Sequence, residues 1–518
     1  MTSAEELNFT ALSKRHEGAS HYANIWYGHY VFSITIVYAM IVVLLQYMNK
    51  RSRTPVKNRF LRRIRFFDPW AHLTLLSIPI IIAFFSSHYS WRKNLSVYMK
   101  RVGRLSYALI PLNLFYNLRF SNSMNYIDLI PLHKWLSRIL CLLALIHSIA
   151  FFIMWATEGV LVEAVSDPYM ALGVAIFAMV IILMFCSLKP FRRRYYNAFY
   201  IIHNLMNFSF IIMTPIHSKP GIVFPLLITN IILLCLQIFI KMWFVKPVTV
   251  VKKIVESDSS LVVIQFPREC IDRPDFSLIT HVRISEYSSR WNPLFWIYPS
   301  HPYTVASIAG DNTLDLVITE NTFKLKEGHK YAMINYYCQQ SKIPPSFFER
   351  DPARLRDVQI ICGGSGIAFG LPIFRYLLNL ENSGMESNIK RCELIWLIND
   401  VVQLDVLKHI FKYDSMPENF TFRVFVSHTA GGNSGSVGDL SDNTDLEIEM
   451  DSLAIKNGEE APYQNVKFRR FDFVDDAKHL KESFDPWVFC CGPDRLISGA
   501  TQFAKDGNIN LVTESYGF

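Results

Sequence analysis

Four histidines in the N-terminal half of the chain form two pairs with the same spacing. His133 and His147 are fourteen residues apart, and so are His203 and His217. Fourteen residues of α-helix turn through about 1400°, within about 40° of a whole number of turns, and rise about 21 Å. Each pair therefore lies on one face of a helix, with one imidazole near each end. If the two helices run in the same direction, His133 can face His203 and His147 can face His217.

Two facing imidazoles indicate a specific chemistry. Imidazole is a good axial ligand for haem iron, and a bis-histidine iron has no open position, which suits electron transfer. We therefore predict two stacked haem b groups. Their iron ligands are His133, His147, His203 and His217. The alternative is that each histidine is an isolated intramembrane residue bonded to a neighbouring carbonyl. Two pairs in matching register favour the haem interpretation, whereas His72 and His88 point to nearly opposite helix faces and are interpreted as packing residues.

A possible flavin motif follows in the C-terminal half. The segment "HPYTVAS" occupies residues 301–307. An aromatic residue followed by a hydroxyl residue at a strand start can place a ring against a flavin and a donor near its reactive nitrogen. A strand edge after a proline turn is the alternative. The candidate FAD residues are His301, Pro302, Tyr303 and Thr304.

Two glycine-containing turns indicate a nucleotide site. The segment "CGGSGIAFG" (362–370) lies between an expected strand and an expected helix, where backbone amides can hold a pyrophosphate. "CCGP" (490–493) follows an apolar strand, which would place Cys491 at the sheet edge where open α/β folds bind ligands. Either segment could also be a simple turn. The candidates for nucleotide binding are Gly363, Gly364, Ser365, Gly366, Cys491, Gly492 and Pro493, with Cys491 also a catalytic candidate. The last residue, Phe518, can cover a flavin face or merely pack.

The elements that position these residues divide the chain into two parts. The chain of 518 residues is 51% hydrophobic and 19% charged, and the apolar excess lies before residue 245. This excludes a purely soluble protein, a disordered chain, a collagen-like fibre and a disulfide-stapled secreted domain. We predict a membrane α-helical bundle of about seven spans. They run over 25–47, 71–88, 103–120, 131–156, 168–188, 195–217 and 221–244.

Basic loops predict the orientation of the bundle. Residues 50–65, 189–194 and 246–253 are rich in Lys and Arg and are expected on the cytoplasmic side. This places the N-terminal segment 1–24 in the lumen or outside the cell, and the C-terminal domain in the cytosol. The basic residues between 92 and 104 disagree with this orientation. The net charge of +8 resides in juxtamembrane blocks, so we expect membrane lipid and not nucleic acid as a partner.

The C-terminal half has the pattern of two soluble domains. Short alternating strands over 247–350 predict an antiparallel β-barrel. From 356 to 518 the order of strand, glycine turn and helix predicts a doubly wound α/β nucleotide-binding domain. Residues 430–463 are acidic and polar and are expected to form a flexible insertion. Nine cysteines without a CxxC pair favour free thiols.

The chain resembles the ferric reductase and NADPH oxidase family, and most of all its fungal metalloreductase branch. The features that carry this resemblance are, in order, the two helices with paired histidines, "HPYT", "GGSGIA" and "CGP". The resemblance implies a ferredoxin-reductase-like module of FAD barrel and NAD(P)H domain behind the bundle. It also implies that the histidines hold two haems, "HPYT" holds FAD, the glycine segment holds the NADPH pyrophosphate and Cys491 lies near the nicotinamide.

The sequence also departs from the family pattern. The family usually has a glycine turn for the flavin phosphate where 334–348 has no glycine. Many relatives have an arginine for the 2′-phosphate where this chain has Asn399, although Arg469 and Arg470 could supply that charge.

These features predict a multi-pass enzyme of the plasma membrane or endoplasmic reticulum. Electrons would pass from cytosolic NADPH to FAD, to the inner haem and then to the outer haem. Ferric or cupric chelates are the preferred acceptors. A superoxide-producing NADPH oxidase is the first alternative, and a non-catalytic haem scaffold is the second. The sequence leaves open whether the chain forms an oligomer or takes a regulatory subunit.

Overall fold

The structure is a computed structural model, and it divides into two compact units, Met1–Trp243 and Phe244–Phe518. Each unit is described by itself. The described residues are 3–51, 59–65, 67–85, 95–118, 126–218, 223–255, 260–271, 278–319, 323–334, 343, 347, 355–383, 388–411, 416–427 and 465–515. The predicted insertion at 430–463, the glycine-free stretch from 335 to 342 and Phe518 lie outside them.

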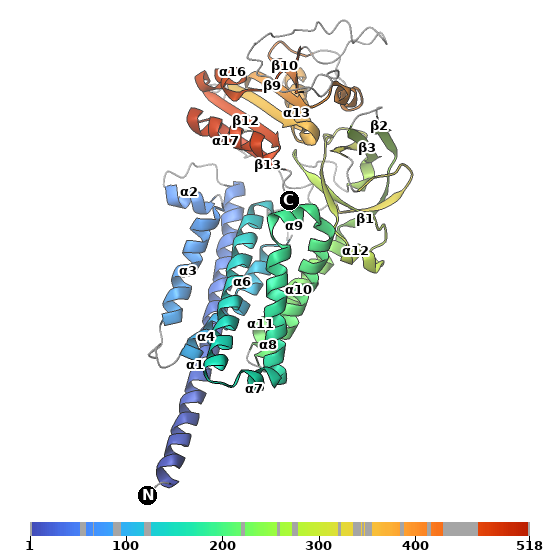
Figure 1. The fold of residues 1–518 in the computed structure, drawn as a ribbon. Coiled ribbons are helices and arrows are strands. Elements are labelled where there is room, and N and C mark those ends of the chain that lie inside the picture. Colours follow the sequence, from blue (N-terminus) through green and yellow to red (C-terminus); the bar gives the residue numbers. More distant parts are fainter. Residues whose placement is uncertain are drawn as a thin grey trace, which may run out of the picture. The chain divides into compact units, whose positions relative to one another are not determined.

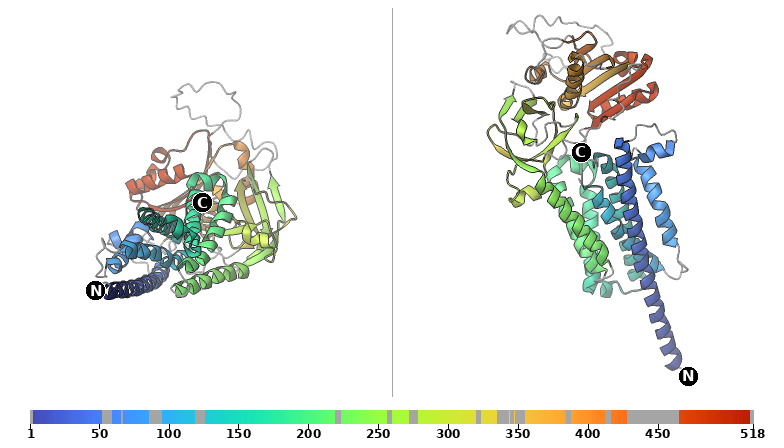
Figure 2. Two further views of the ribbon diagram at one scale, coloured as in Figure 1. Left: turned by 60° about the horizontal axis from the view of Figure 1, so that its bottom comes forward. Right: turned by 180° about the vertical axis from the view of Figure 1, so that it is seen from behind.

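The N-terminal unit is a bundle of helices (Figure 1). They are α1 (Ser3–Arg51), α2 (Arg59–Arg65), α3 (Pro69–Phe85), α4 (Leu95–Ala108), α5 (Ile110–Phe115), α6 (Tyr126–Thr157), α7 (Leu161–Ser166), α8 (Pro168–Cys186), α9 (Lys189–Arg194), α10 (Tyr196–His217) and α11 (Phe224–Trp243). Helix α1 begins at Ser3, so polar residues before the predicted first span are helical too, and this end of α1 reaches beyond the other helices (Figure 2). Many large apolar side chains on the outside of the bundle are exposed, for example Ile82 and Phe239, as expected for a bundle surrounded by lipid.

Five helices in the described part of the chain are long and apolar enough to cross a membrane. They are Asn24–Met48, Leu129–Thr157, Pro168–Cys186, Tyr196–His217 and Phe224–Trp243. Each coincides with one of the seven predicted spans, but the count of seven is not confirmed. The predicted span 71–88 corresponds to the shorter helix α3, which has 17 residues.

The predicted span 103–120 is divided between α4 and α5. The break falls at Leu109, and Pro111 lies in the first turn of α5, where a helix tolerates proline. Helix α4 is also too polar for a simple span because it contains Arg101 and Arg104. Arg101 is only 2% exposed, and its guanidinium donates to Asn24 Oδ1 and to the Phe84 carbonyl, each at 2.8 Å. These bonds explain how a cation resides within the bundle, which the sequence left without an account.

The C-terminal unit begins with two antiparallel sheets. The first has the order β1 (Val245–Thr249), β7 (Lys330–Ile334), β4 (His281–Ser285) and β5 (His301–Thr304), and the second has β2 (Lys252–Val255), β3 (Leu261–Pro267) and β6 (Thr313–Thr319). A bridge between Val305 and Leu316 links them, and an apolar core that includes Phe266 and Met333 lies beneath. The antiparallel arrangement agrees with the prediction, but a closed barrel is not established.

A six-stranded sheet follows, in which every pair of neighbouring strands is parallel. Its order is β11 (Asn465–Lys467), β10 (Phe420–Val426), β9 (Ile389–Ile398), β8 (Arg356–Gly363), β12 (Asp485–Gly492) and β13 (Asn510–Ser515). Helix α13 (Ile367–Asn382) packs on one face, and α16 (Phe473–Asp476) and α17 (Asp494–Gly507) pack on the other. The strand order reverses direction between β8 and β12, which is where doubly wound sheets bind their ligands. Antiparallel sheets followed by this parallel sheet form a ferredoxin-reductase-like fold.

Candidate functional site

The histidines His147 and His217 face each other across the bundle. Their ring centroids are 6.4 Å apart, and the ring planes are inclined at 76°. His147 Nδ1 lies 2.8 Å from the Met99 carbonyl on α4, and His217 Nδ1 lies 2.7 Å from the Tyr169 carbonyl on α8. A carbonyl can only accept, so each Nδ1 donates, and each Nε2 keeps a lone pair for a metal.

The separation of these two rings fits a single metal ion that both rings bind. Imidazole nitrogen binds a divalent metal such as zinc at about 2 Å. Two rings that hold one such ion from opposite sides therefore have centroids about 6 Å apart. The centroid separation of His147 and His217 matches this requirement, and the tautomer leaves Nε2 of each ring free of a proton, as a metal ligand needs.

The other pair is arranged differently. His133 Nδ1 lies 3.2 Å from the Asn113 carbonyl, and the Asn113 side chain in turn bonds Ser137. His203 lies against Phe199, with ring centroids 5.3 Å apart, and its buried Nδ1 has no hydrogen-bond partner among the described residues. Among the described residues, no ring contact or hydrogen bond joins His133 to His203. The structure thus shows a direct ring contact for the outer pair, His147 and His217.

Two further observations bear on whether a haem fits here. The main neighbour of α6 is α4 and the main neighbour of α10 is α8, so the two helices that carry the histidine pairs have their closest packing with other helices. Arg104 on α4 has a buried Nη1 without a hydrogen-bond partner in the part of the chain that the structure describes. A buried, unpaired guanidinium nitrogen requires an anionic or polar partner, and haem carries propionates. The residues therefore fit a haem, and Arg104 is a residue that sequence reasoning had recorded only as an exception to the charge rule.

In the C-terminal unit, the "HPYT" segment forms strand β5. The His301 ring stacks on Phe323, with centroids 4.4 Å apart and planes 10° from parallel. Burial, and secondarily the nearby Arg283 cation, lower the pKa of His301 to about 4, so its ring is neutral at pH 7. Pro302 and Tyr303 pair with Arg283 and Val282 of β4.

The last residue of this motif bonds to the end of the chain. Thr304 Oγ1 donates to Glu514 Oε1 of β13 at 3.2 Å. Sequence reasoning missed Glu514, although it opens the terminal "ESYGF" whose last residue, Phe518, was proposed as a flavin cover. Two segments more than two hundred residues apart are therefore neighbours beside the flavin candidates.

The glycine segment lies between β8 and α13, as predicted. Gly363 ends β8, Gly364 to Gly366 make a 3₁₀ turn that contains Ser365, and α13 begins at Ile367. Gly364 has a φ of +54°, which disfavours a side chain. The indole Nε1 of the fully buried Trp396 donates to the Gly364 carbonyl at 2.8 Å. This bond fixes the peptide at the point where backbone amides would meet a pyrophosphate.

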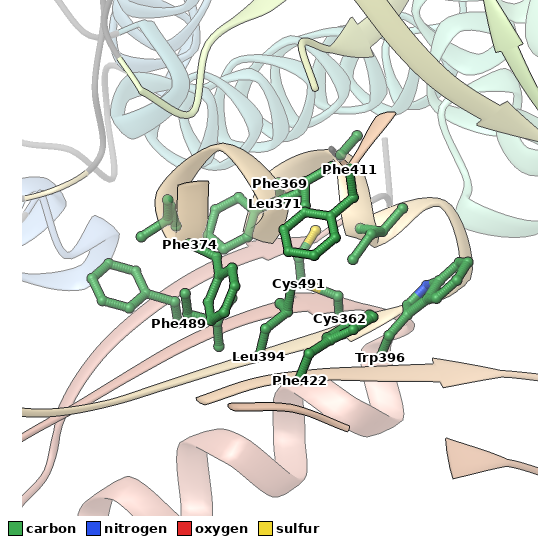
Figure 3. Packing of buried hydrophobic residues seen from close by; sticks show 14 of the residues in the cluster. Cys362, Phe369, Leu371, Phe374, Leu394, Trp396, Phe411, Phe422, Phe489 and Cys491 are labelled. Carbon is green, nitrogen blue, oxygen red and sulfur yellow. The ribbon is translucent and has the colours of Figure 1, made fainter. Parts of the chain in front are cut away.

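The "CGP" turn meets the glycine segment. A Cβ on Gly363 would lie 3.1 Å from Pro493 Cδ, and one on Gly492 would lie 3.5 Å from Gly363 Cα. Cys491 pairs with Cys362 across β12 and β8, and both thiols lie fully buried beneath α13 near Phe369 (Figure 3). Burial raises the pKa of the Cys362 thiol well above its usual range. Cys491 is thus at the predicted strand end but inside an apolar cluster, and its proposed role beside the nicotinamide stays a prediction.

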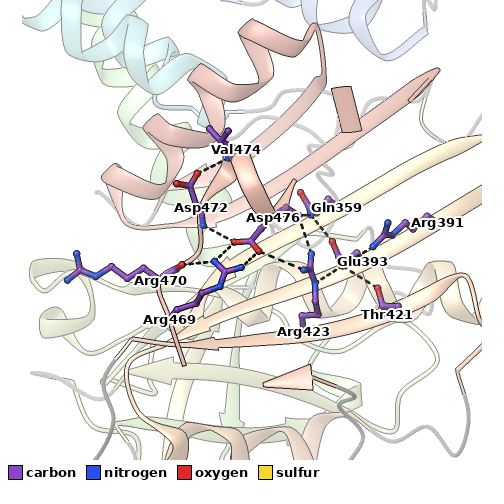
Figure 4. Close-up of polar contacts among 10 residues, drawn as sticks. All are labelled: Gln359, Arg391, Glu393, Thr421, Arg423, Arg469, Arg470, Asp472, Val474 and Asp476. Atoms are coloured by element: carbon purple, nitrogen blue, oxygen red, sulfur yellow. Dashed lines mark hydrogen bonds and ion pairs between the residues drawn. The ribbon is translucent and has the colours of Figure 1, made fainter. Parts of the chain in front are cut away.

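A buried polar network supports the opposite face of the sheet (Figure 4). Glu393 is 1% exposed, accepts a hydrogen bond from Gln359 Nε2 at 2.7 Å and forms an ion pair with Arg423, with 2.6 Å between Nε and Oε1. Arg469 forms a bidentate pair with Asp476 at 2.9 and 2.5 Å. The Arg469 side chain is therefore already paired with Asp476, whereas the exposed Arg470 side chain points away from Asp476. Of the two arginines considered for the 2′-phosphate, Arg470 is the one whose side chain faces outward.

Known proteins resemble the chain over both units. A family model described as ferric reductase like transmembrane component matches residues 102–214, and one described as ferric reductase NAD binding domain matches residues 355–504. Proteins named probable metalloreductase AIM14 are similar over nearly the whole length. The one from Zygosaccharomyces rouxii is 36% identical and covers 98% of this chain and 99% of its own. The one from Saccharomyces cerevisiae is 34% identical and covers 99% and 100%.

Solved structures are similar to part of the chain. A cytochrome P450 reductase GcoB from Amycolatopsis has a TM-score of 0.35 and 15% identity, covering 53% of this chain and 71% of that chain. A ferredoxin-NADP+ reductase from Plasmodium falciparum has a TM-score of 0.30 and 12% identity, covering 52% and 96%.

The two family models match in the order in which the two units occur, and the sequence identity extends from one end of the chain to the other. The matched membrane component contains His133, His147 and His203, and the matched nucleotide domain contains both glycine turns. The chain is thus a transmembrane oxidoreductase that belongs to the ferric reductase family.

Proposed function

We propose that this protein carries electrons from NADPH through FAD and two haems to an acceptor on the other side of the membrane, and that this acceptor is a ferric or cupric chelate. The observation that carries the proposal is the facing pair His147 and His217, whose rings are spaced for one metal and whose Nδ1 atoms are both held by carbonyls. When bound, the flavin takes two electrons from a hydride and the haems pass them on one at a time.

The residues of the chain bind and orient these groups. The amides of Gly364 to Gly366 open helix α13 and face the pyrophosphate, while Trp396 holds the turn. Thr304 and Glu514 supply a hydroxyl and a carboxylate beside the flavin. His133 and His203 bind the inner haem iron, and His147 and His217 bind the outer one.

The proposed topology follows from the basic loops. Residues 1–24 lie outside or in the lumen, 25–245 form the haem domain, 247–350 bind FAD and 356–518 bind NADPH in the cytosol. The membrane is the plasma membrane or the endoplasmic reticulum. NADPH is preferred to NADH by resemblance, and the exposed Arg470 is the residue offered for the 2′-phosphate.

Two observations favour a metal chelate as acceptor. The relatives with more than 30% identity carry the name metalloreductase. The connections at the end of the bundle near His147 are short, because α7 follows α6 after three residues and α8 begins two residues after α7. Within the described residues, these connections place little chain over the outer pair, and this favours the approach of a bulky chelate.

An anaerobic absorbance experiment tests this proposal. NADPH is added to purified, FAD-supplemented protein, and then either a ferric chelate or oxygen is admitted while haem reoxidation is timed. We expect a bis-imidazole haem spectrum, reduction of the haems by NADPH, and faster haem reoxidation by the ferric chelate than by oxygen. Faster discharge by oxygen, with superoxide detected, identifies an NADPH oxidase instead.

A variant pair tests the ligand assignment. His147→Leu should remove the outer haem and abolish transmembrane ferric reduction. His29→Leu is the control, because His29 also lies in a membrane span and its ring lies against Trp26, not against one of the four paired histidines. A His147→Leu protein with full haem content and full rate refutes the assignment. Haem without any NADPH oxidation favours the non-catalytic scaffold.

A further inference from the structure

The two histidines of the outer pair are held by the same local arrangement on two different helices. His147 donates to the carbonyl of Met99, and four residues after Met99 comes Gly103. His217 donates to the carbonyl of Tyr169, and four residues after Tyr169 comes Gly173. In an α-helix the positions i and i+4 are neighbours on one face. Each imidazole therefore rests on a carbonyl and a glycine that are adjacent on the neighbouring helix. We call this pair a carbonyl–glycine seat; it is formed by Met99 and Gly103 for His147, and by Tyr169 and Gly173 for His217.

The glycines are required for this contact. A Cβ on Gly103 would lie 2.8 Å from His147 Nδ1, and a Cβ on Gly173 would lie 2.5 Å from His217 Cε1. Real Cβ atoms essentially never approach other heavy atoms this closely. The clash would be with a rigid imidazole ring whose position is held by its bond to the carbonyl of Met99 or Tyr169. Alanine at either position must therefore displace or rotate the imidazole and weaken its bond to the carbonyl.

The seats also fix how each ring is turned. A ring that donates from Nδ1 and lies flat against a glycine has little freedom about its Cβ–Cγ bond. The two seats lie on α4 and α8, and they hold the rings at 76° to each other. The inner pair has no such device among the described glycines, because none of them lies against His133 or His203.

We propose that Gly103 and Gly173 are positioning residues of the outer site, which set the orientation of the His147 and His217 rings. They thereby determine the binding affinity and the redox potential of the outer haem, and not those of the inner haem. This proposal rests on the proposed function, in which these histidines hold a haem. Bonds that orient a metal-ligating histidine typically change metal affinity about 10- to 100-fold when they are disturbed.

The test uses the full-length protein and three glycine-to-alanine variants. Gly103→Ala and Gly173→Ala are compared with Gly28→Ala, because a Cβ on Gly28, in the membrane helix α1, meets nothing within 4 Å. Haem per chain, the midpoint potential of each haem and the low-spin ferric EPR signal are measured, since that signal depends on the angle between the two imidazole planes. We expect each seat variant to lose the outer haem, or to keep it with a shifted potential and a changed EPR signal. Gly28→Ala should match the wild type.

The inner haem serves as the internal control for folding. A variant that keeps the inner haem spectrum while the outer one changes supports the proposal. Seat variants with unchanged haem content, potentials and EPR signals overturn it, and so do variants that lose both haems together. A wild-type protein that binds no haem refutes the proposed function itself, so the two failures are distinguishable.

Discussion

The N-terminal unit (Met1–Trp243, here the membrane unit) and the C-terminal unit (Phe244–Phe518, here the nucleotide unit) position their candidate functional residues in different ways. In the bundle, four histidines on two helices are brought into pairs by helical periodicity, and their backbone partners come from neighbouring helices. In the nucleotide unit, the candidate residues come from segments far apart in the sequence, as when Thr304 meets Glu514 or Trp396 meets Gly364. The difference shows that a repeat can reveal a site on straight helices, whereas a site built on turns depends on the packing of the sheet.

Both units contain buried polar atoms without a hydrogen-bond partner among the described residues, and the C-terminal unit also contains a buried ionic network. The bundle leaves His203 Nδ1 and Arg104 Nη1 without partners among the described residues. The nucleotide unit builds Glu393, Arg423 and Asp476 into a connected ionic network. We interpret His203 Nδ1 and Arg104 Nη1 as positions for the proposed haems, and the ionic network as structural because its charges are paired within the fold. The following variants test this contrast.

The largest effect is expected in the bundle. His133→Leu should abolish NADPH-driven reduction of any haem, because in the proposed function the inner haem would receive the electrons first, whereas His147→Leu should leave one haem that NADPH still reduces. Anaerobic haem absorbance after NADPH addition distinguishes the two. Equal reduction in both variants would contradict the assignment of inner and outer pairs.

The next effect concerns stability in the nucleotide unit. Glu393→Ala should lower the free energy of unfolding of this unit by about 3–5 kcal/mol, because it leaves the Arg423 cation without its closest partner in a buried site. Thermal unfolding of the full chain, followed by loss of NADPH-dependent dye reduction, measures the change. Glu482→Ala is the matched control, since Glu482 is exposed. A loss below about 1 kcal/mol would show that the network contributes little.

A smaller effect should separate binding from catalysis. Trp396→Phe keeps the buried ring but removes the bond to the Gly364 carbonyl, which is worth about 1 kcal/mol. The KM for NADPH should rise about 5- to 10-fold with little change in kcat. Trp487→Phe is the control, because its indole also makes a hydrogen bond, at 3.0 Å to Asp485, away from the glycine segment. A change in kcat alone would contradict the proposed positioning role.

The smallest effect is a pH dependence at the flavin motif. The pKa of His301 is lowered to about 4 in the folded protein, mainly by burial, so between pH 4 and 6.5 the unfolded chain binds more protons than the folded chain. The stability contributed by neutral His301 is therefore fully present above pH 6.5 and is lost as the pH falls towards 4. His301→Gln should flatten this part of the curve of melting temperature against pH. An unchanged slope would show that other groups cause it.

How far the sequence predicts the structure differs between the units. The fourteen-residue spacing is enough to pair the four histidines, because an α-helix has a fixed period. The glycine segment between strand and helix was also recognisable, because a parallel strand that leads into a helix needs a tight turn there. The seven spans were not all supported. The span 103–120 breaks at Leu109, and the charge of Arg101 on α4 is accommodated by a contact with Asn24, which is 77 residues away in the sequence.

Other features had no signal in the sequence. Nothing in the order of residues marks Met99 and Tyr169 as the carbonyls that orient the outer pair, or joins Glu514 to Thr304. The Arg469 side chain looked free for a phosphate, and only the structure shows it bound to Asp476.

The sequence by itself determined the two units, the histidine pairs and the glycine turns, because hydropathy, helical period and backbone sterics act over a few neighbouring residues. Only the tertiary structure decided which carbonyl, glycine or carboxylate each of these residues meets, because those contacts join segments from 20 to more than 200 residues apart. Such contacts depend on how helices and strands pack, and packing is a property of the whole fold.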